Sequence, residues 1–445
     1  MAKAKQPPNR FKKSEALFKR ALVLMPGGVS SPVRSFQSVN LSPVFIRQGE
    51  GSRLTDVDSN TYIDYVMSYG PLILGHADPA VQAAVAKQMS RGSSFGCCAE
   101  EEILLADLIA QYMPNVPMVR FVSSGTEAVM SAIRLTRAVT GRSLIIKIAG
   151  GYHGHVDAML VGAGSGATTH GVPSSPGIPA EVTGNTLVIP FNDVDAARHV
   201  FANHGDKIAG LFLELVMGNI GVVPPQPGYL QILRALCDEH KSLFVADEVM
   251  TGFRVARGGA QSLFDVKPDL TCLGKIIGGG LPVGAYGGRP ELMNQISPAG
   301  PVYQAGTLSG NPLSMAAGIV TLRHLQSADS YQQLESLAGS LDTGLISGAA
   351  AAKLPLAVQR CGSMITPFFV QDQPAAQAGV RNYADALACN TRKYAQFFRL
   401  MLEAGVMIPP SQFEAWFISL AHSQVDIDTT VEAAGRAMRT MAAEC

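Results

Sequence analysis

The feature that most constrains the fold is an alternation of apolar, strand-like segments and helical segments that begins near residue 118. The helical segments include Glu127–Thr140, Val194–His204 and Gly228–His240. Alternation of this kind predicts an α/β domain with a mostly parallel, seven-stranded sheet. The expected strands are Met118–Val122, Ser143–Ile148, Thr186–Pro190, Ile208–Leu213, Leu243–Ala246, Leu270–Leu273 and Ala285–Gly287.

The sequence on either side of this domain has a different character. Three strand-like segments precede it, and a long helix, Asn311–Gln326, leaves it. Helices Ser330–Ala350 and Asn382–Ala404 then alternate with isolated strands, which predicts a smaller α+β domain. We therefore predict an N-terminal segment at 1–70 that joins the small domain, a large domain at 71–325 and the small domain at 326–445.

Composition and charge narrow the classes of partner. Of the 445 residues, 47% are apolar and 16% are charged, and the net charge is zero. The charged share is well below the usual quarter, so a large core is expected, and nothing favours nucleic acid or an anionic membrane. Seven cysteines without metal-ligand spacing indicate reduced thiols, no metal and a cytoplasmic location. The basic N-terminus lacks the apolar stretch of a secretory signal.

Two charged residues follow strands of the predicted sheet. Asp247 comes directly after Leu243–Ala246, and Lys275 follows Leu270–Leu273. Because ligands bind at the carboxyl ends of parallel strands, both side chains can face one site. A buried aspartate holds the protonated ring nitrogen of pyridoxal phosphate (PLP), and a desolvated lysine bonds its aldehyde. The alternatives are a helix cap for Asp247 and a solvated side chain for Lys275.

Two hydroxyl-rich turns before helices suit an anion. In SSGTEA, backbone N–H groups around Gly125 and the hydroxyls of Ser124 and Thr126 can bind a phosphate, unless Thr126 merely caps the helix. GTLSGNP (Gly306–Pro312) offers a second phosphate contact, from this chain or a partner chain. Its alternative is a helix start capped by Ser309 or Asn311.

Two other motifs carry chemistry. In GGYHGH the ring of Tyr152 can stack on a flat cofactor, whereas a third ligand for a His-x-His metal site is not evident. GAGSGA nominally matches a dinucleotide-binding pattern, but prolines and glycines follow it where a helix is required. We expect the segment Gly162–Pro179 to be a mobile lid.

Taken together, these motifs resemble those of class III PLP-dependent aminotransferases. The resemblance rests on SSGTEA, YHGH, ADEVMTGFR, LGKIIGGGLPVGAYGG and AGPVYQAGTLSGNP, in this order. More narrowly, GGVSSPVRSF, SYGPLILGHADP, AGSG and FEAWFISLAH are similar to segments of the glutamate-1-semialdehyde 2,1-aminomutase family. The likeness begins near Phe11 and extends to the C-terminus. It implies PLP fold type I and a homodimer with its sites at the interface, and the enzyme that makes the semialdehyde is a candidate partner.

The resemblance also implies roles for individual residues. Lys275 would bond PLP and shuttle protons, Asp247 would pair with the ring nitrogen, and Tyr152 and Val249 would pack on the two ring faces. The other implied cofactor-binding residues are Ser124, Gly125, Thr126, His153, Asn219 and, from the neighbouring subunit, Thr307. The implied substrate-binding residues are Arg34, which would bind the substrate carboxylate, with Ser165 on the lid and Tyr303 and Glu414 near the cofactor.

The implied reaction is an intramolecular amino transfer that converts glutamate-1-semialdehyde into 5-aminolevulinate for tetrapyrrole biosynthesis. The cofactor would alternate between PLP and pyridoxamine phosphate (PMP). The alternatives are a class III transaminase acting on an ω- or β-amino acid, and a PLP-fold binding module without catalysis. The chain departs from the family pattern at Tyr69, Ala149, Gly151, Leu215, Asp78 and Trp416. Of these, Tyr69 and Trp416 are expected to affect the shape of the pocket.

Overall fold

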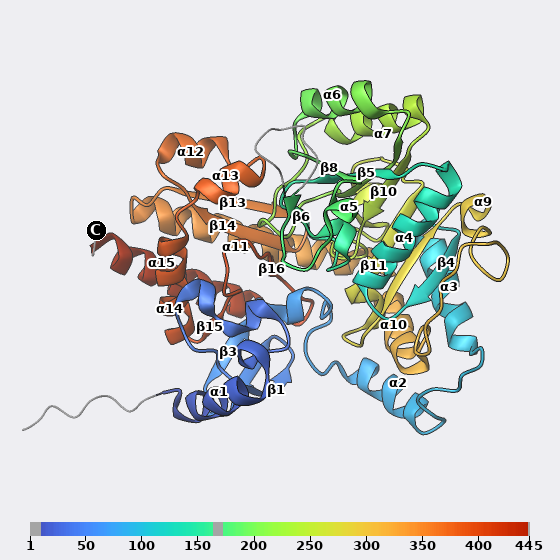
Figure 1. Ribbon diagram of the computed structural model, residues 1–445. Coiled ribbons are helices and arrows are strands. Elements are labelled where there is room, and N and C mark those ends of the chain that lie inside the picture. Colours follow the sequence, from blue (N-terminus) through green and yellow to red (C-terminus); the bar gives the residue numbers. More distant parts are fainter. Residues whose placement is uncertain (1–9, 163–171, 444–445) are drawn as a thin grey trace, which may run out of the picture.

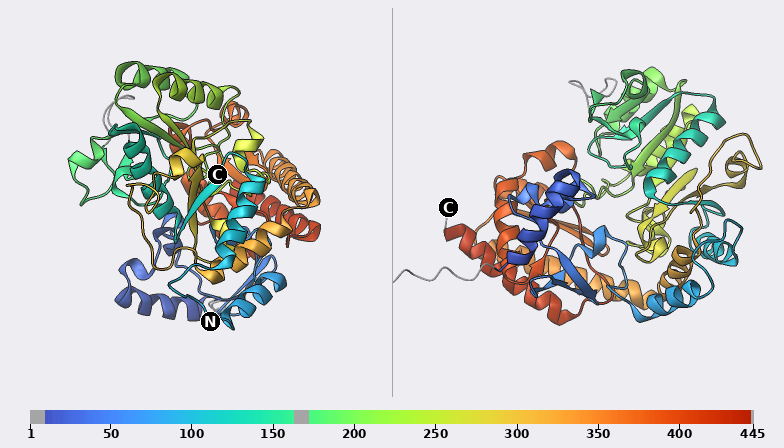
Figure 2. Two further views of the ribbon diagram at one scale, coloured as in Figure 1. Left: turned by 90° about the vertical axis from the view of Figure 1, so that its right-hand side faces the viewer. Right: turned by 60° about the horizontal axis from the view of Figure 1, so that its bottom comes forward.

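The structure, a computed structural model, describes residues 10–162 and 172–443. Figure 1 shows a larger part built from the middle of the chain and a smaller part built from its two ends. The smaller part brings the N-terminal strands next to C-terminal helices (Figure 2). Among the described residues, no helix is long and apolar enough to cross a membrane.

A seven-stranded sheet forms the centre of the larger part. Its spatial order is β4-β12-β11-β10-β9-β5-β8, and all neighbours are parallel except β12, which runs antiparallel to both β11 and β4. The prediction of a mostly parallel sheet is therefore confirmed. The strands are β4 (Met118–Val122), β5 (Leu144–Ile148), β8 (Thr186–Ile189), β9 (Ile208–Glu214), β10 (Leu243–Asp247), β11 (Leu270–Gly274) and β12 (Gly284–Gly288).

Helices cover this sheet, as its largely buried strands require. The helix α4 (Gly125–Thr140) packs against β9 to β12, and α6 (Val194–His204) lies beside α7 (Tyr229–His240), which packs on β9 and β10. A further group of helices forms around α10 (Pro312–His324), which packs against both α2 (Pro79–Met89) and α3 (Glu100–Tyr112). The short helices of this part are α5 (Ala180–Thr183), α8 (Gly259–Leu263) and α9 (Pro290–Met293).

The smaller part joins the two ends of the chain through a shared sheet. Strands β1 (Ile46–Glu50), β2 (Arg53–Asp56) and β3 (Thr61–Asp64) are completed by β15 (Val406–Met407), which is parallel to β3. This pairing supports the expectation that the N-terminal segment joins the small domain, although the domain limits stay a prediction. The other elements are β13 (Leu356–Cys361), β14 (Met364–Phe369), β16 (Trp416–Phe417), α1 (Lys12–Leu24), α11 (Ala328–Ala351), α12 (Gln373–Ala378) and α15 (Gln424–Ala443).

One sequence-based expectation is wrong in this part. The segment expected to be a single helix at Asn382–Ala404 contains two, α13 (Tyr383–Ala388) and α14 (Thr391–Glu403). The break lies at Cys389, whose backbone is extended, and the side chain of Asn390 caps α14 by accepting the N–H of Lys393 at 3.0 Å. Asparagine competes with helical backbone hydrogen bonds, which is why it starts a new helix here instead of continuing the old one.

Candidate active site

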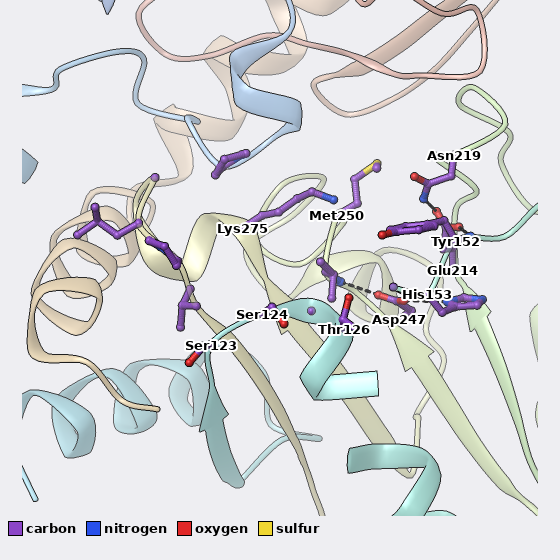
Figure 3. A pocket seen from close by; sticks show the side chains of 18 residues that line it. Ser123, Ser124, Thr126, Tyr152, His153, Glu214, Asn219, Asp247, Met250 and Lys275 are labelled. Carbon is purple, nitrogen blue, oxygen red and sulfur yellow. Dashed lines mark hydrogen bonds and ion pairs between the residues drawn. The ribbon is translucent and has the colours of Figure 1, made fainter. Parts of the chain in front are cut away.

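The carboxyl ends of the central strands enclose a cavity of about 430 Å³. Its lining comes from the ends of β4, β9, β10 and β11 and from the loops that follow, which is where open parallel sheets bind ligands (Figure 3). The cavity brings together most of the predicted cofactor-binding residues. These are Ser124, Gly125, Thr126, Tyr152, His153, Asn219, Asp247, Val249 and Lys275.

Asp247 is buried and fixed by two contacts at the end of β10. Its Oδ2 lies 2.7 Å from Nδ1 of His153, and its Oδ1 accepts the backbone N–H of Val249 at 3.0 Å. The helix-cap alternative for Asp247 is therefore wrong, because no helix starts here. The Nε2 atom of His153 is also buried, and no partner for it lies among the described residues. A buried aspartate at the cavity wall suits a ligand that carries a positive charge.

Lys275 directly follows β11, and its side chain extends into the cavity (Figure 3). Its backbone is left-handed, with φ of 50°, an uncommon conformation for a side-chain-bearing residue. Burial lowers the pKa of the amine, an effect that Asp247, Glu214 and Glu414 oppose and Arg254 reinforces. A desolvated lysine with a lowered pKa is a nucleophile for carbonyl groups. The alternative of a solvated Lys275 is wrong.

The N-terminus of α4 forms the opposite wall. Ser124 caps it by accepting the N–H of Glu127 at 3.2 Å, and Glu127 accepts the N–H of Ser123 at 2.7 Å. The first helical N–H groups, which no intrahelical carbonyl can reach, remain for a ligand, and an anion is favoured there. Thr126 is inside the helix, so the alternative in which it is the cap is wrong. A Cβ at Gly154 would lie 2.5 Å from Oγ1 of Thr126, so only glycine allows this close approach.

The sequence reasoning missed Glu214, the residue beside Asp247 in the register of β9 and β10. This buried carboxylate accepts the backbone N–H groups of Tyr152 at 3.1 Å and Gly218 at 2.9 Å, and the side-chain amide of Asn219 at 2.9 Å. Burial raises its pKa, and the neighbouring Asp247 adds to this effect. Glu214 thus fixes two pocket residues. The signal was available, since β9 also ends in a carboxylate.

Glu248 has a different role from its neighbour Asp247. It is fully buried and lies outside the cavity lining, where it accepts the hydroxyl of Thr251 at 2.9 Å and the backbone N–H groups of Ala260 at 2.6 Å and Gln261 at 3.0 Å. These contacts hold the loop between β10 and α8 in one shape. Glu248, the second carboxylate of the ADE motif, therefore stabilises the loop that follows Asp247 and does not line the cavity itself.

The predicted substrate residues are less closely assembled. Glu414 lies near Lys275, and burial raises the pKa of Glu414 to about 7, with Lys275 opposing the shift. Burial raises the pKa of Tyr69, the charge of Glu414 adds to this effect and the charge of Arg34 opposes it. Arg34 itself is exposed, on the one-turn helix Pro32–Ser35.

Two other predicted residues, Tyr303 and Thr307, are not assembled at the cavity of this chain. Tyr303 is 71% exposed, Thr307 is also exposed, and both lie outside the described lining of the cavity. Asn311 caps α10, which is the ordinary alternative considered for the GTLSGNP turn. Ser165 lies outside the described residues, so its position and the mobile lid stay predictions. The described flanks of that segment, Val161–Gly162 and Val172–Pro173, pair as two short antiparallel strands, β6 and β7.

The cavity residues fit PLP as a ligand. Asp247 meets the need for an anion beside a ring nitrogen, the start of α4 suits a phosphate, and Lys275 supplies an amine. Tyr152 and Val249 also line the cavity that Asp247, Lys275 and the start of α4 enclose. Within residues 10–162 and 172–443, no group of three histidine, cysteine or acidic residues could hold a metal ion.

Comparison with known proteins identifies the family. A family model described as "Aminotransferase class-III" matches residues 35–431. A protein of Desulforamulus reducens named glutamate-1-semialdehyde 2,1-aminomutase is 52% identical over 98% of this chain and 99% of its own length. The chain belongs to the class III aminotransferases, in the glutamate-1-semialdehyde 2,1-aminomutase family. This finding agrees with the resemblance inferred from the motifs.

Solved structures of class III aminotransferases share this fold. An ω-transaminase from Sphaerobacter thermophilus is 32% identical, with a TM-score of 0.88 over 96% of this chain and 97% of that one. A glutamate-1-semialdehyde aminomutase from Pseudomonas aeruginosa is 26% identical, with a TM-score of 0.85 over 96% and 95% of the two chains. A variant of the latter has been solved in complex with PMP.

Proposed function

We propose that this chain is a PLP-dependent aminomutase that converts glutamate-1-semialdehyde into 5-aminolevulinate, a step of tetrapyrrole biosynthesis. The identity of about half of all residues with proteins of that name, over nearly the full length, supports the substrate. The single observation that carries the chemistry is the convergence of Lys275 and Asp247 on one cavity lined by the start of α4.

When bound, PLP or PMP carries the amino group and delocalises the negative charge that develops on the substrate carbon. Asp247 keeps the ring nitrogen protonated, and its contact with His153 fixes the orientation of the carboxylate. The backbone N–H groups of Gly125 and Thr126, with the Ser124 hydroxyl, would bind the phosphate. Tyr152 and Val249 would pack on the ring, and Asn219, which lines the cavity, is held by its hydrogen bond to Glu214.

Lys275 acts as the base that moves protons to and from the reacting substrate carbons. Its burial favours the neutral amine, which is the form that can accept a proton. Glu414 lies close enough to Lys275 for each to shift the pKa of the other, so it influences the charge state of the base.

We further propose that Arg34 binds the carboxylate of the substrate. The charges of Arg34 and Glu414 both act on Tyr69, and the charge of Lys275 acts on Glu414, which supports a place for Arg34 on the Lys275 side of the cavity. Arginine is suited to this role because its planar guanidinium can bind a carboxylate through two parallel hydrogen bonds. Ser165, on the predicted lid, and Tyr303 are proposed as further substrate contacts.

The site is proposed to be completed in a homodimer. Thr307 is assigned to the cofactor phosphate of the neighbouring subunit, in keeping with its exposure in the single chain. Large apolar side chains are also exposed on nearby elements, among them Phe95 at 48%, Ile103 at 71% and Leu308 at 55%. Such a surface is typical of subunit interfaces. We also propose a cytoplasmic location, which suits the six described cysteines, all of them free thiols.

A single assay tests the proposed function. Purified protein with bound cofactor is given glutamate-1-semialdehyde and no other amine or oxo acid, and 5-aminolevulinate is counted per active site. We expect many equivalents, because an intramolecular transfer regenerates the cofactor form each cycle. One equivalent or fewer would contradict the aminomutase and favour the second candidate, a transaminase for an ω- or β-amino acid. The similarity to the S. thermophilus ω-transaminase is what keeps that candidate in view.

A further inference from the structure

Arg254 is a fully buried arginine on the loop that follows Asp247. Its guanidinium joins three distant segments of the chain: Nη1 donates to the carbonyl of Ile418 at 2.9 Å and to the hydroxyl of Ser363 at 3.2 Å, and Nη2 donates to the carbonyl of Gly70. It also stacks over the ring of Phe417, with 5.3 Å between Cζ and the ring centroid. One side chain thus connects the catalytic loop of the large part to both ends of the chain.

The charge of Arg254 has no acidic partner in the described part of the chain. No carboxylate there forms an ion pair with the guanidinium, and Nε has no hydrogen-bond partner there. Burial lowers the pKa of Arg254 to about 9, and Tyr331 opposes this shift, so the side chain is still a cation at neutral pH. Burying an unpaired charge is costly, and a polar group or a leucine could fill the same space more cheaply.

The segment that Arg254 holds packs against Lys275. Gly70 has φ of 113°, and a Cβ built there would lie 3.4 Å from Cδ of Lys275 and 3.2 Å from Cε1 of Phe417. The Gly70 backbone therefore lies beside the aliphatic part of the lysine, with no room between them for a further side chain. Burial lowers the pKa of Lys275, and the charge of Arg254 adds a smaller effect in the same direction.

We propose that Arg254 is a positioning residue for Lys275: its hydrogen bond to Gly70 holds the backbone that lies beside the lysine side chain, and its stacking on Phe417 places a buried cation on the same side of the cavity. The importance of a neutral Lys275 rests on the proposed function. Three carboxylates raise the pKa of Lys275 and so favour its charged form: Asp247 on β10, Glu214 on β9 and Glu414 before β16. Of these charged groups, Arg254 is the cation and the other three are carboxylates.

The test measures the charge of Lys275 in cofactor-free protein, so its result is independent of the substrate. The rate at which an amine-reactive acylating reagent labels Lys275 is followed by peptide mass spectrometry over a series of pH values. The plateau at high pH reports access to the amine, and the midpoint reports its protonation. In Arg254→Gln we expect the midpoint to move to higher pH, so that labelling below the midpoint slows several-fold.

Arg257→Gln is the matched control. Arg257 lies three residues along the same loop and is exposed, and it contacts Gln326 and the ring of Tyr112, not Gly70. Removing its charge should leave the midpoint of Lys275 at the wild-type value. A folded Arg254→Gln variant whose midpoint equals that of the control would overturn the proposal.

Arg254→Lys separates the charge from the geometry and remains informative if the Gln variant does not fold. Lysine keeps a positive charge, but its donors all lie on one nitrogen at the end of a flexible chain, so it should not reproduce the hydrogen bonds that the two nitrogens of the arginine fork make to Gly70, Ile418 and Ser363. We expect a nearly wild-type labelling midpoint together with faster hydrogen–deuterium exchange in a peptide that contains Gly70. A midpoint as high as in Arg254→Gln would contradict the role of the charge, and unchanged exchange would contradict the role of the hydrogen bond.

Discussion

The two sides of the cavity are built in different ways. On the cofactor side, Asp247 and Glu214 stand at the ends of adjacent strands, buried and held by short hydrogen bonds. On the substrate side, Arg34 comes from an exposed one-turn helix and Glu414 from a loop, while Tyr303 lies apart. The sheet therefore fixes the buried acid–base groups, whereas substrate recognition depends on segments outside the sheet.

The largest effect is expected on the cofactor side, where the sheet of one chain positions the reactive amine and the buried carboxylates. Lys275→Ala should reduce turnover by about 10⁴-fold, because the general base is lost. Lys353 offers a close control, since it is exposed and has the same left-handed backbone, with φ of 54° against 50° for Lys275. Lys353→Ala should keep wild-type turnover in the 5-aminolevulinate assay. Equal activity of the two variants would contradict the assigned base.

A smaller effect is expected for the proposed carboxylate site. Arg34→Gln should lower kcat/KM by about 100-fold, mainly through KM, because a charged hydrogen bond contributes about 3 kcal/mol at most. The absorbance of the bound cofactor should stay unchanged, because Arg34 lies outside the cavity lining. Arg47→Gln, at another exposed arginine of the N-terminal segment, is the control. If Arg34→Gln altered the cofactor spectrum and spared KM, the division between the two sides would be wrong.

The third prediction concerns pH and Glu414. Its pKa is about 7 in the folded protein against 4.5 without the fold, so folding favours its protonated form. This contribution to stability is complete below about pH 4.5 and is lost as the pH rises through about 7. With screening of the partly exposed group, the change should amount to about 1–2 kcal/mol.

The measurement compares the melting temperatures of cofactor-free wild type and Glu414→Gln across this pH range. The advantage of the wild type should shrink as the pH rises and then level off above about 7. Glu403→Gln changes an exposed glutamate nearby in sequence and should give a difference that is flat with pH. A flat difference for Glu414→Gln as well would show that the carboxyl is not buried in this way.

The smallest effect is expected at Trp416, where the sequence suggested an altered pocket. Trp416 is fully buried and lies outside the cavity lining: it stacks on Phe397 and donates its Nε1 hydrogen to the hydroxyl of Tyr394 at 3.3 Å. Trp416→Phe should cost about 1 kcal/mol of stability through the lost hydrogen bond and leave KM unchanged. A clear change in KM would contradict this assignment and show that Trp416 influences substrate binding.

Strand ends were the predictable part of this molecule. Asp247 and Lys275 could be predicted because each follows a short apolar run. Strands buried on both faces of a parallel sheet have such runs, and ligands bind at their carboxyl ends. The same rule could have found Glu214. The roles of Glu248 and Arg254 could not be predicted, since their partners lie far away in the sequence, such as Gly70 and Ile418 for Arg254.

The backbone of Lys275 has a consequence for how this protein can fail. A lysine with φ of 50° holds a conformation that costs about 1 kcal/mol or more for any residue with a Cβ, and glycine adopts it freely. Lys275→Gly, which removes the reactive amine, should therefore relieve this backbone strain and should not lower the stability of the folded protein. Because cellular proteases remove proteins according to how often they unfold, this inactive variant should persist in the cell at wild-type abundance. Measuring protein levels would overlook this loss, and only an assay of the product would reveal it.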